Sequence, residues 1–261
     1  MELRGLLKRI DDNKKEIRKH RPLTAQEVKQ LDAYFRIGMT YTSNALEGNS
    51  LTLTETKVLL EDGITIGGKP IRDCYEAVGH AEAYDFMLEA ARSETLAVSE
   101  GIVLRLHKLF YNKIDPEQAG KYRGERVFIT GAQYLPPLPE EISMCMQTFI
   151  GELNEKWENS HPIILSAFAH QKLVDIHPFI DGNGRTARLL MNLIIINSGY
   201  QIISIPPVLR ADYIDALEAA RHGSGIKKEA FCTFIAKCEV EAQKDYCRMF
   251  NIALPPYKGL L

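Results

Sequence analysis

The sequence predicts an all-α fold that carries one small β-hairpin. Apolar residues recur at helical spacing through most of the 261 residues, and prolines, glycines and capping residues divide the pattern into segments of helix length. One stretch, residues 120–137, departs from this pattern because β-forming residues lie on both sides of a glycine. These β-forming residues are Val127, Phe128, Ile129 and Tyr134.

The composition is that of an ordinary globular protein, with 45% hydrophobic and 25% charged residues. A net charge of −2 provides no overall positive field for nucleic acid. No apolar run is long enough to span a membrane. The five cysteines are odd in number and form no Cys-x-x-C pair, which favours free thiols in a reducing compartment. We therefore expect a cytoplasmic protein without nucleic-acid or membrane partners.

The N-terminal part predicts three helices joined by short breaks. Residues 1–20 have leucines and isoleucines on one side and lysines and arginines on the other, as in a surface helix rather than a secretory signal. Thr24 and Glu27 form a capping box that opens a helix from about residue 25 to 45. Gly48 or Asn49 can end this helix in a left-handed conformation, and a threonine at 52 or 54 can cap the next one.

The remaining helices follow from the same start and stop signals. A loop with two glycines precedes one helix, and Pro162 is placed to open another. The last apolar runs are separated by Gly199 and by two prolines. The expected helices cover about residues 71–91, 99–110, 140–159, 162–176, 189–196, 212–222 and 227–250.

Residues 177–188 concentrate chemically active side chains between two apolar helices. They read His-Pro-Phe-Ile-Asp-Gly-Asn-Gly-Arg-Thr-Ala-Arg. Pro178 disfavours helix at the residue before it, so the first helix is expected to end at His177. The dipole at a helix C-terminus favours positive charge, so we expect it to raise the proton affinity of the imidazole. His177 is then a general-base candidate.

The second half of this stretch has the features of an anion site. Asp181 is an oxygen ligand of the type that Mg²⁺ uses beside phosphates. Gly182 and Gly184 permit close backbone approach at a helix N-terminus. Arg185 and Arg188 are three residues apart and share a helix face, which suits a polyphosphate. A purely structural turn would need neither the aspartate nor both arginines.

The same twelve residues resemble the HPFxDGNGRxxR signature of Fic-domain proteins at every fixed position. The resemblance implies a Fic-fold helical bundle that transfers AMP from ATP to a protein hydroxyl of Ser, Thr or Tyr. His177 would be the base and Asp181 would hold Mg²⁺. The residues implied in nucleotide binding are Gly182, Asn183, Gly184, Arg185, Thr186 and Arg188 on the phosphates, and Val174 and Tyr213 in the rest of the pocket.

A second stretch, residues 43–48, also carries a resemblance. Ser43 and Glu47 are four residues apart and share a helix face, which on its own fits a plain helix–turn–helix. Together with Gly48 they resemble the inhibitory motif (S/T)xxxE(G/N) of many Fic proteins. The resemblance implies that Glu47 pairs with Arg188 and occupies the γ-phosphate position. Its place before the core is similar to the class with an N-terminal inhibitory helix in the same chain.

The expected hairpin at residues 120–137 can be an ordinary surface hairpin. Its position before the motif is similar to the flap of Fic proteins, which clamps the target segment by strand addition. This resemblance implies target-positioning roles for five residues: Tyr122, Val127, Phe128, Ile129 and Tyr134. Tyr134 stands where family members often carry histidine.

These observations predict a helical N-terminal region, residues 1–95, followed by a Fic core, residues 96–261. The predicted function is autoinhibited adenylylation of a target protein or of the chain itself, with ATP and Mg²⁺. One alternative is removal of AMP, with Glu47 positioning a water molecule. Another is a non-catalytic module that binds a nucleotide or a target, although such a module would not need His177. Some relatives use UTP or phosphocholine, and the two arginines favour a triphosphate.

Overall fold

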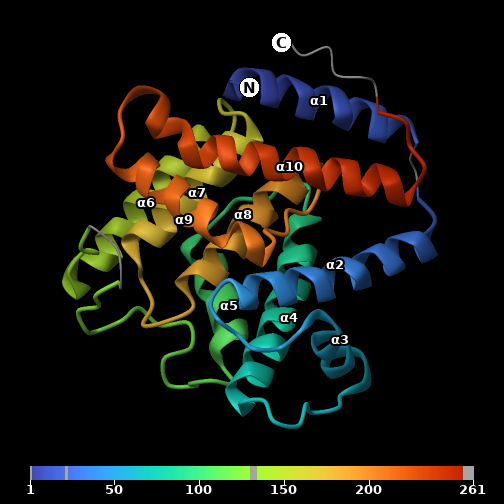
Figure 1. Cartoon of the computed structure of the whole chain (residues 1–261). Helices are drawn as coiled ribbons and strands as arrows, with labels where there is room; N and C mark the ends of the chain where they lie inside the picture. The colour runs from blue at the N-terminus through green and yellow to red at the C-terminus, as the bar shows by residue number, and fades with distance from the viewer. Residues whose placement is uncertain (1, 21–22, 130–133, 255–261) are drawn as a thin grey trace.

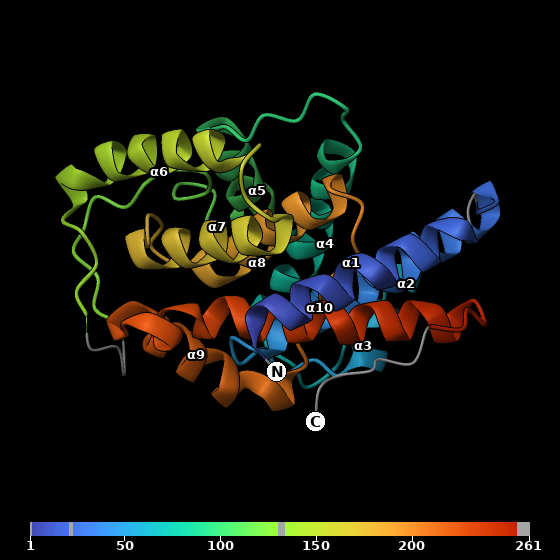
Figure 2. The same cartoon turned by 90° about the horizontal axis from the view of Figure 1, so that it is seen from above.

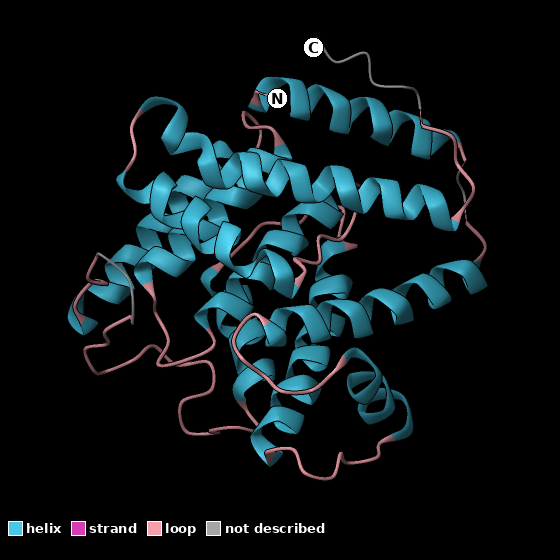
Figure 3. Cartoon of the chain, in the orientation of Figure 1, coloured by secondary structure: helices cyan, strands magenta, loops and turns pink. Residues whose placement is uncertain are grey.

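The structure, a computed structural model, describes residues 2–20, 23–129 and 134–254. These residues form ten α-helices and three short 3₁₀ turns (Figures 1 and 3). The helices are α1 (Leu3–Lys19), α2 (Ala25–Ala45), α3 (Leu53–Asp62), α4 (Ile71–Ala91), α5 (Glu100–Tyr111), α6 (Ile142–Lys156), α7 (Pro162–Ile176), α8 (Asn183–Asn197), α9 (Arg210–His222) and α10 (Ala230–Met249). The 3₁₀ turns are Pro139–Glu141, Pro207–Leu209 and Gly225–Glu229.

Helices α7 and α8 pack side by side at the centre and are joined by the short turn that carries the motif. Most residues of α8 are buried, because the helix is apolar on nearly every side. Leu189 and Leu193, for example, have no exposed surface. The prediction that this helix forms the buried centre of the fold is therefore confirmed.

Helices α4 and α5 pack against α8, and α2 crosses α4 (Figure 1). One hydrophobic cluster joins them, with residues such as Met39, Tyr84, Leu106 and Leu190 fully or almost fully buried. The cluster draws on helices from both sides of residue 95. It holds the end of α2 close to the start of α8, although the two segments are far apart in the sequence.

Helix α1 lies along α10 at the outer edge of the bundle (Figures 1 and 2). Leu6, Ile10 and Ile17 are buried on its inner face, and the charged residues of α1 lie on the outer face. This is the amphipathic surface helix that the sequence predicts.

The capping residues fix several helix ends where the sequence places them. Thr24 accepts a hydrogen bond from the backbone of Glu27 and completes a capping box at the start of α2. Thr52 and Glu55 do the same at the start of α3, so Thr52 rather than Thr54 is the cap. Ser99 caps α5.

No β-strand is found in the described part of residues 120–137, so the hairpin expected there is not confirmed. The turn expected at its tip, residues 130–133, lies outside the described residues. The flanking residues Phe128 and Leu135 are 72% and 69% exposed. An isolated pair of strands is only marginally stable in water, and the described residues offer it no neighbouring sheet.

Across the described residues, no helix is both long and apolar enough to cross a membrane. All five cysteines are free, as the sequence predicts: Cys74, Cys145, Cys232, Cys238 and Cys247.

Candidate active site

His177 ends α7 in a left-handed conformation, with φ 50° and ψ 56°. Its backbone N–H still donates to the carbonyl of Leu173 at 3.0 Å, while Pro178 prevents a further helical turn. A non-glycine residue rarely adopts this conformation, so surrounding contacts must hold it. The predicted helix end at His177 is thus observed.

The imidazole of His177 contacts the carbonyl of Val174 through one of its two nitrogens. Its Nδ1 lies 3.3 Å from the carbonyl oxygen of Val174, which can only accept, so Nδ1 carries the proton and Nε2 keeps a lone pair. Burial lowers the pKa of His177, and the hydrogen bond to Val174 offsets only part of this effect. The expectation of a raised proton affinity was therefore wrong, because desolvation exceeds the effect of the helix end.

The turn after His177 is held by packing and by one amide side chain. Phe179 is fully buried and stacks on His107, with ring centroids 3.8 Å apart. The side chain of Asn183 accepts from the backbone N–H of Phe179 and donates to its carbonyl, at 2.9 and 2.8 Å. Gly182 has φ 78°, and a Cβ there would lie 2.7 Å from the ring of Phe110. Glycine is therefore required at this position.

Helix α8 begins directly after Gly182, and its first N–H groups have no carbonyl acceptor within the helix. Thr186, which was expected on the phosphates, is fully buried, and its hydroxyl donates to the carbonyl of Gly182 at 2.9 Å. Thr186 and the side chain of Asn183 thus stabilise the turn. An anion would meet the backbone of the first turn instead.

Arg188 points from α8 to the end of α2 and is 2% exposed. Its Nε donates to the hydroxyl of Ser43 at 2.9 Å, and its Nη2 donates to the carbonyl of Ser43 at 2.8 Å. The same Nη2 lies 2.7 Å from Oε1 of Glu47. The structure thus brings Arg188 into contact with Ser43 and Glu47, which lie 145 and 141 residues before it in the sequence.

The carboxylate of Glu47 lies over the start of α8. A Cβ added to Gly184 would collide with Oε1 of Glu47, so the carboxylate occupies the space above the first turn. Burial raises the pKa of Glu47, but the charges of Arg188 and Arg185 outweigh it, and the net pKa lies below the usual value. Glu47 is therefore ionised at neutral pH and stands where an anion would bind.

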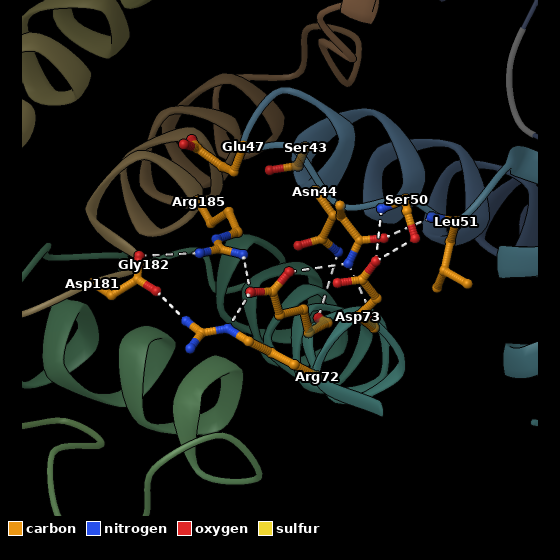
Figure 4. A network of polar contacts seen from close by, with 12 residues as sticks. Ser43, Asn44, Glu47, Ser50, Leu51, Arg72, Asp73, Asp181, Gly182 and Arg185 are labelled. Atoms are coloured by element: carbon orange, nitrogen blue, oxygen red, sulfur yellow. Dashed lines mark hydrogen bonds and ion pairs between the residues drawn. The ribbon is translucent and has the colours of Figure 1, made fainter. Parts of the chain in front are cut away.

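Arg185 lies in a network of charges that the sequence did not indicate (Figure 4). Its guanidinium is 3.1 Å from Glu76 and 3.2 Å from Asp181. Arg72 lies between the same two carboxylates, 3.2 Å from Glu76 and 2.6 Å from Asp181. Two arginines and two carboxylates therefore alternate beside the first turn of α8.

The turn that carries Glu47 is anchored to α4. Gly48 has φ 92° and reverses the chain after α2. The side chain of Asn49 donates to Glu76 and to the carbonyl of Asp73, both at 3.0 Å. Ser50 donates to the carboxylate of Asp73 through its backbone and its hydroxyl (Figure 4). Glu76 thus contacts both the turn of Glu47 and the guanidinium of Arg185.

Tyr213 and Val174 lie near this centre with contacts of their own. The hydroxyl of Tyr213 is 3.0 Å from Nε2 of His170 and 3.4 Å from Arg188. Tyr213 is almost fully buried and contacts Arg188 from the side opposite Ser43. The carbonyl of Val174 meets both His177 and the hydroxyl of Tyr134.

The segment before the motif packs on the site through a few side chains. Tyr122 donates to Glu100 at 2.7 Å, and Tyr134 donates to the carbonyl of Val174 at 3.0 Å. Val127 and Ile129 are half-buried, whereas the side chain of Phe128 points into solvent.

His107 of α5 joins this segment to the motif. Its Nδ1 accepts from the backbone of Gly120 at 2.9 Å, and its Nε2 donates to the carbonyl of Asp181 at 3.1 Å. Burial lowers the pKa of His107 to about 4, so the ring is neutral and keeps both bonds at neutral pH.

Comparisons with known proteins agree with this geometry. The model of the Fic/DOC family matches residues 97–195. A protein of Drosophila grimshawi named Protein adenylyltransferase Fic is 38% identical over 208 residues, which are 79% of this chain and 41% of that protein. The chain therefore spans about two fifths of the length of such curated relatives.

Solved structures extend the likeness to nearly the whole chain. A fragment of Fic-1 from C. elegans is 31% identical with a TM-score of 0.85, over 96% of this chain and 74% of that one. A Fic-domain protein from Bacteroides thetaiotaomicron shares the fold at 24% identity, with a TM-score of 0.84 over 96% of this chain and all of that one. From its motif, its fold and these relatives, the chain belongs to the Fic/DOC family.

Proposed function

We propose that this chain is an autoinhibited protein adenylyltransferase. The single observation that carries the proposal is the pairing of Arg188 with Glu47 above the first turn of α8, 2.7 Å apart. A helix N-terminus with two buried arginines suits a polyphosphate, and a carboxylate of the same chain lies over it. A neutral histidine at the end of the preceding helix supplies the base.

In the proposed reaction, Nε2 of His177 accepts the proton of a Ser, Thr or Tyr hydroxyl. The oxygen attacks the α-phosphorus of ATP, and the bond from that phosphorus to the bridging oxygen breaks. Pyrophosphate leaves with the electron pair, and AMP stays on the hydroxyl. Arg185, Arg188 and the amides of α8 neutralise the charge that builds up on the leaving group.

Asp181 is the residue that would hold Mg²⁺. Its side chain is 38% exposed, and its two oxygens are bound by Arg72, Arg185 and the backbone of Gly182. No group of three or more metal-ligating side chains is found in the part of the chain that the structure describes. A single carboxylate fits Mg²⁺, which takes its other ligands from phosphates and water. The ion would neutralise phosphate charge.

Autoinhibition follows in this proposal from the position of Glu47. Its carboxylate holds Arg188 and lies over Gly184, so the γ-phosphate cannot occupy the same place. The alternative, removal of AMP with Glu47 directing a water molecule, is compatible with the same position. Substitution of Glu47 separates these alternatives, since AMP removal needs the carboxylate and AMP transfer is inhibited by it.

Residues 120–137 are proposed as a flap that receives the target segment by strand addition, with formation of the hairpin on docking. Phe128 and Leu135 are largely exposed and can contact such a segment.

We also propose that residues 1–95 act as the inhibitory part and residues 96–261 as the transferring part. A self-modification reaction would use a hydroxyl of this chain in place of the target.

The test of the proposal uses ATP labelled at the α- or the γ-phosphate, with intact-mass analysis of the protein. Adenylylation predicts label from the α-phosphate only and a mass gain of one AMP less water per event. Label from the γ-phosphate would mean phosphorylation. ATP binding without any covalent label, in the Glu47→Gly variant as well, would favour a non-catalytic binding module.

Removal of the anion-site charges is expected to weaken Mg·ATP binding. Arg185→Ala loses charge-assisted hydrogen bonds, each worth about 1.5–3 kcal/mol, which predicts a loss of roughly ten- to a hundredfold in affinity. Asp181→Ala should weaken Mg·ATP and have much less effect on ATP without the metal. Calorimetry with and without Mg²⁺ measures both effects. Unchanged affinity and activity in both variants would contradict the polyphosphate assignment.

A further inference from the structure

Arg123 is a buried arginine that the proposed chemistry does not use. It is 2% exposed and lies in the first arm of the flap, before the residues that the structure leaves undescribed. Its Nε donates to the carbonyl of His177 at 2.8 Å. Its Nη1 and Nη2 donate to the carbonyls of Glu125 and Pro137, at 2.8 and 2.7 Å. One guanidinium therefore binds the backbone at three places.

Within the described residues, Arg123 forms no ion pair with a carboxylate. Its positive charge is compensated by three carbonyl dipoles instead. Burial of a cation without a counter-ion is costly, so each of these hydrogen bonds is needed to keep it in place. The arrangement stabilises one geometry of the three carbonyls, because the nitrogens of a guanidinium form a rigid planar fork.

The three carbonyls belong to parts of the chain that have to act together. Glu125 and Pro137 lie in opposite arms of the proposed flap. His177 is the proposed base, and its left-handed backbone directs its carbonyl away from α7. The backbone N–H of Arg123 also donates to the carbonyl of Pro178 at 2.9 Å. Arg123 therefore holds two successive carbonyls of the turn that orients the imidazole.

We infer that Arg123 is a positioning residue that aligns the base and sets the spacing of the two flap arms with one side chain. The inference rests on the proposed adenylyltransferase activity and adds to it a link between target docking and base alignment. When a target segment pairs with the flap, a displacement of either arm is transmitted to His177 through the rigid guanidinium of Arg123. Misplacement of reacting atoms by about 1 Å can cost a hundredfold in rate.

Arg123 also acts on the imidazole through its charge. The groups that face His177 are Arg123 from the flap, Glu47 from the end of α2 and Asp181 from the motif turn. Burial is the main cause of the lowered pKa of His177. The guanidinium lowers this pKa further, and the two carboxylates raise it. Loss of the charge should therefore raise the pKa, whereas loss of the fork alone should leave it nearly unchanged.

The experiment compares Arg123→Lys and Arg123→Gln, each in the Glu47→Gly background. Arg105→Lys and Arg105→Gln are matched controls, because Arg105 is an exposed arginine of α5 that lies outside the flap and the motif. Lysine keeps the charge but cannot bridge three carbonyls. We measure self-adenylylation by intact mass, hydrolysis of ATP to AMP, Mg·ATP affinity, and the pKa of His177 by NMR.

Arg123→Lys is expected to lower both AMP transfer and AMP release to water by roughly ten- to a hundredfold. Mg·ATP affinity and the pKa of His177 should stay near the parent values. Arg123→Gln should lower the same rates and raise the pKa of His177. Rates in Arg123→Lys equal to those in Arg105→Lys would overturn the inference. A loss confined to protein transfer would also overturn it, since Arg123 would then serve the flap alone.

The inference can fail independently of the proposed function. If the Glu47→Gly parent transfers no AMP, the adenylyltransferase assignment fails, and NMR of the ring still tests the link to His177. An unchanged pKa and ring tautomer in Arg123→Gln would then overturn the link. Unchanged Mg·ATP affinity and melting temperature show that the variants are folded.

Discussion

Replacement of His177 by alanine is expected to abolish AMP transfer while leaving Mg·ATP bound. The imidazole lies at the end of α7, whereas the proposed phosphate contacts come from Asp181 and the first turn of α8. Loss of a positioned general base costs about 10²- to 10⁴-fold in rate. Intact-mass kinetics give the rate, and calorimetry gives the affinity for Mg·ATP.

The matched control is His222→Ala, because His222 lies at the exposed end of α9. The His222→Ala variant should transfer AMP at the wild-type rate. Equal labelling by the His177→Ala variant and the wild type would exclude His177 as the base and require a different mechanism.

The rate should fall as the pH falls through the pKa of His177, because only the neutral ring accepts a proton. Burial holds this pKa below its usual value of 6.5, so activity should persist below pH 6.5 before it is lost. A pH–rate profile of the Glu47→Gly variant measures this limb. A limb centred above pH 6.5 would mean that burial does not lower the pKa of His177 in the working enzyme.

The helices could be predicted because their start and stop signals are local. Thr24 with Glu27, Ser99 and Pro162 mark helix ends that the structure reproduces. The hairpin was predicted from β-propensity alone, and propensity does not supply the neighbouring strand that such a pair needs. Strand formation at this position depends on contacts with residues outside the hairpin, which the local sequence does not reveal.

The centre of the candidate site was predictable for the same reason. His177, Asp181, Arg185 and Arg188 lie within twelve residues, so one turn brings them together whatever the rest of the fold does. The partner of Arg188 required a second motif, since Glu47 comes from the turn after α2. The structure pairs these two side chains at 2.7 Å.

The supporting residues were missed because their partners are distant in the sequence. Arg72 and Glu76 look like an ordinary pair on a helix surface, yet they contact Asp181 and Arg185 more than 100 residues later. Arg123 lies in the expected hairpin, and its neighbours in the sequence do not indicate that it is buried. Tertiary packing decides whether a polar residue is buried. The order of polar and apolar residues in a single sequence gives little indication of this.

Replacement of Glu47 by glycine is expected to activate the protein. Arg188 would keep its contacts with Ser43 and Tyr213 and would be free to hold the γ-phosphate. Breaking a buried pair exposes about 3–5 kcal/mol, and each 1.4 kcal/mol is about tenfold. Because the side chain of Glu47 is 36% exposed, solvent screens part of this energy. We therefore expect a gain of roughly ten- to a thousandfold in AMP transfer.

Ser43→Ala should give a smaller gain than Glu47→Gly, because Ser43 only holds the guanidinium of Arg188 in the geometry that Glu47 meets. Glu94→Gly is the matched control, since Glu94 is exposed in the turn after α4. Intact mass followed over time, for the wild type and the three variants, measures the rates. The largest gain in Glu47→Gly, a smaller one in Ser43→Ala and none in Glu94→Gly would identify the carboxylate of Glu47 as the inhibitor, because only Glu47→Gly frees the space above Gly184. Equal rates in wild type and Glu47→Gly would mean that residues 43–48 serve only as a turn between helices. Loss of AMP removal in Glu47→Gly would assign the carboxylate to the hydrolysis that removes AMP.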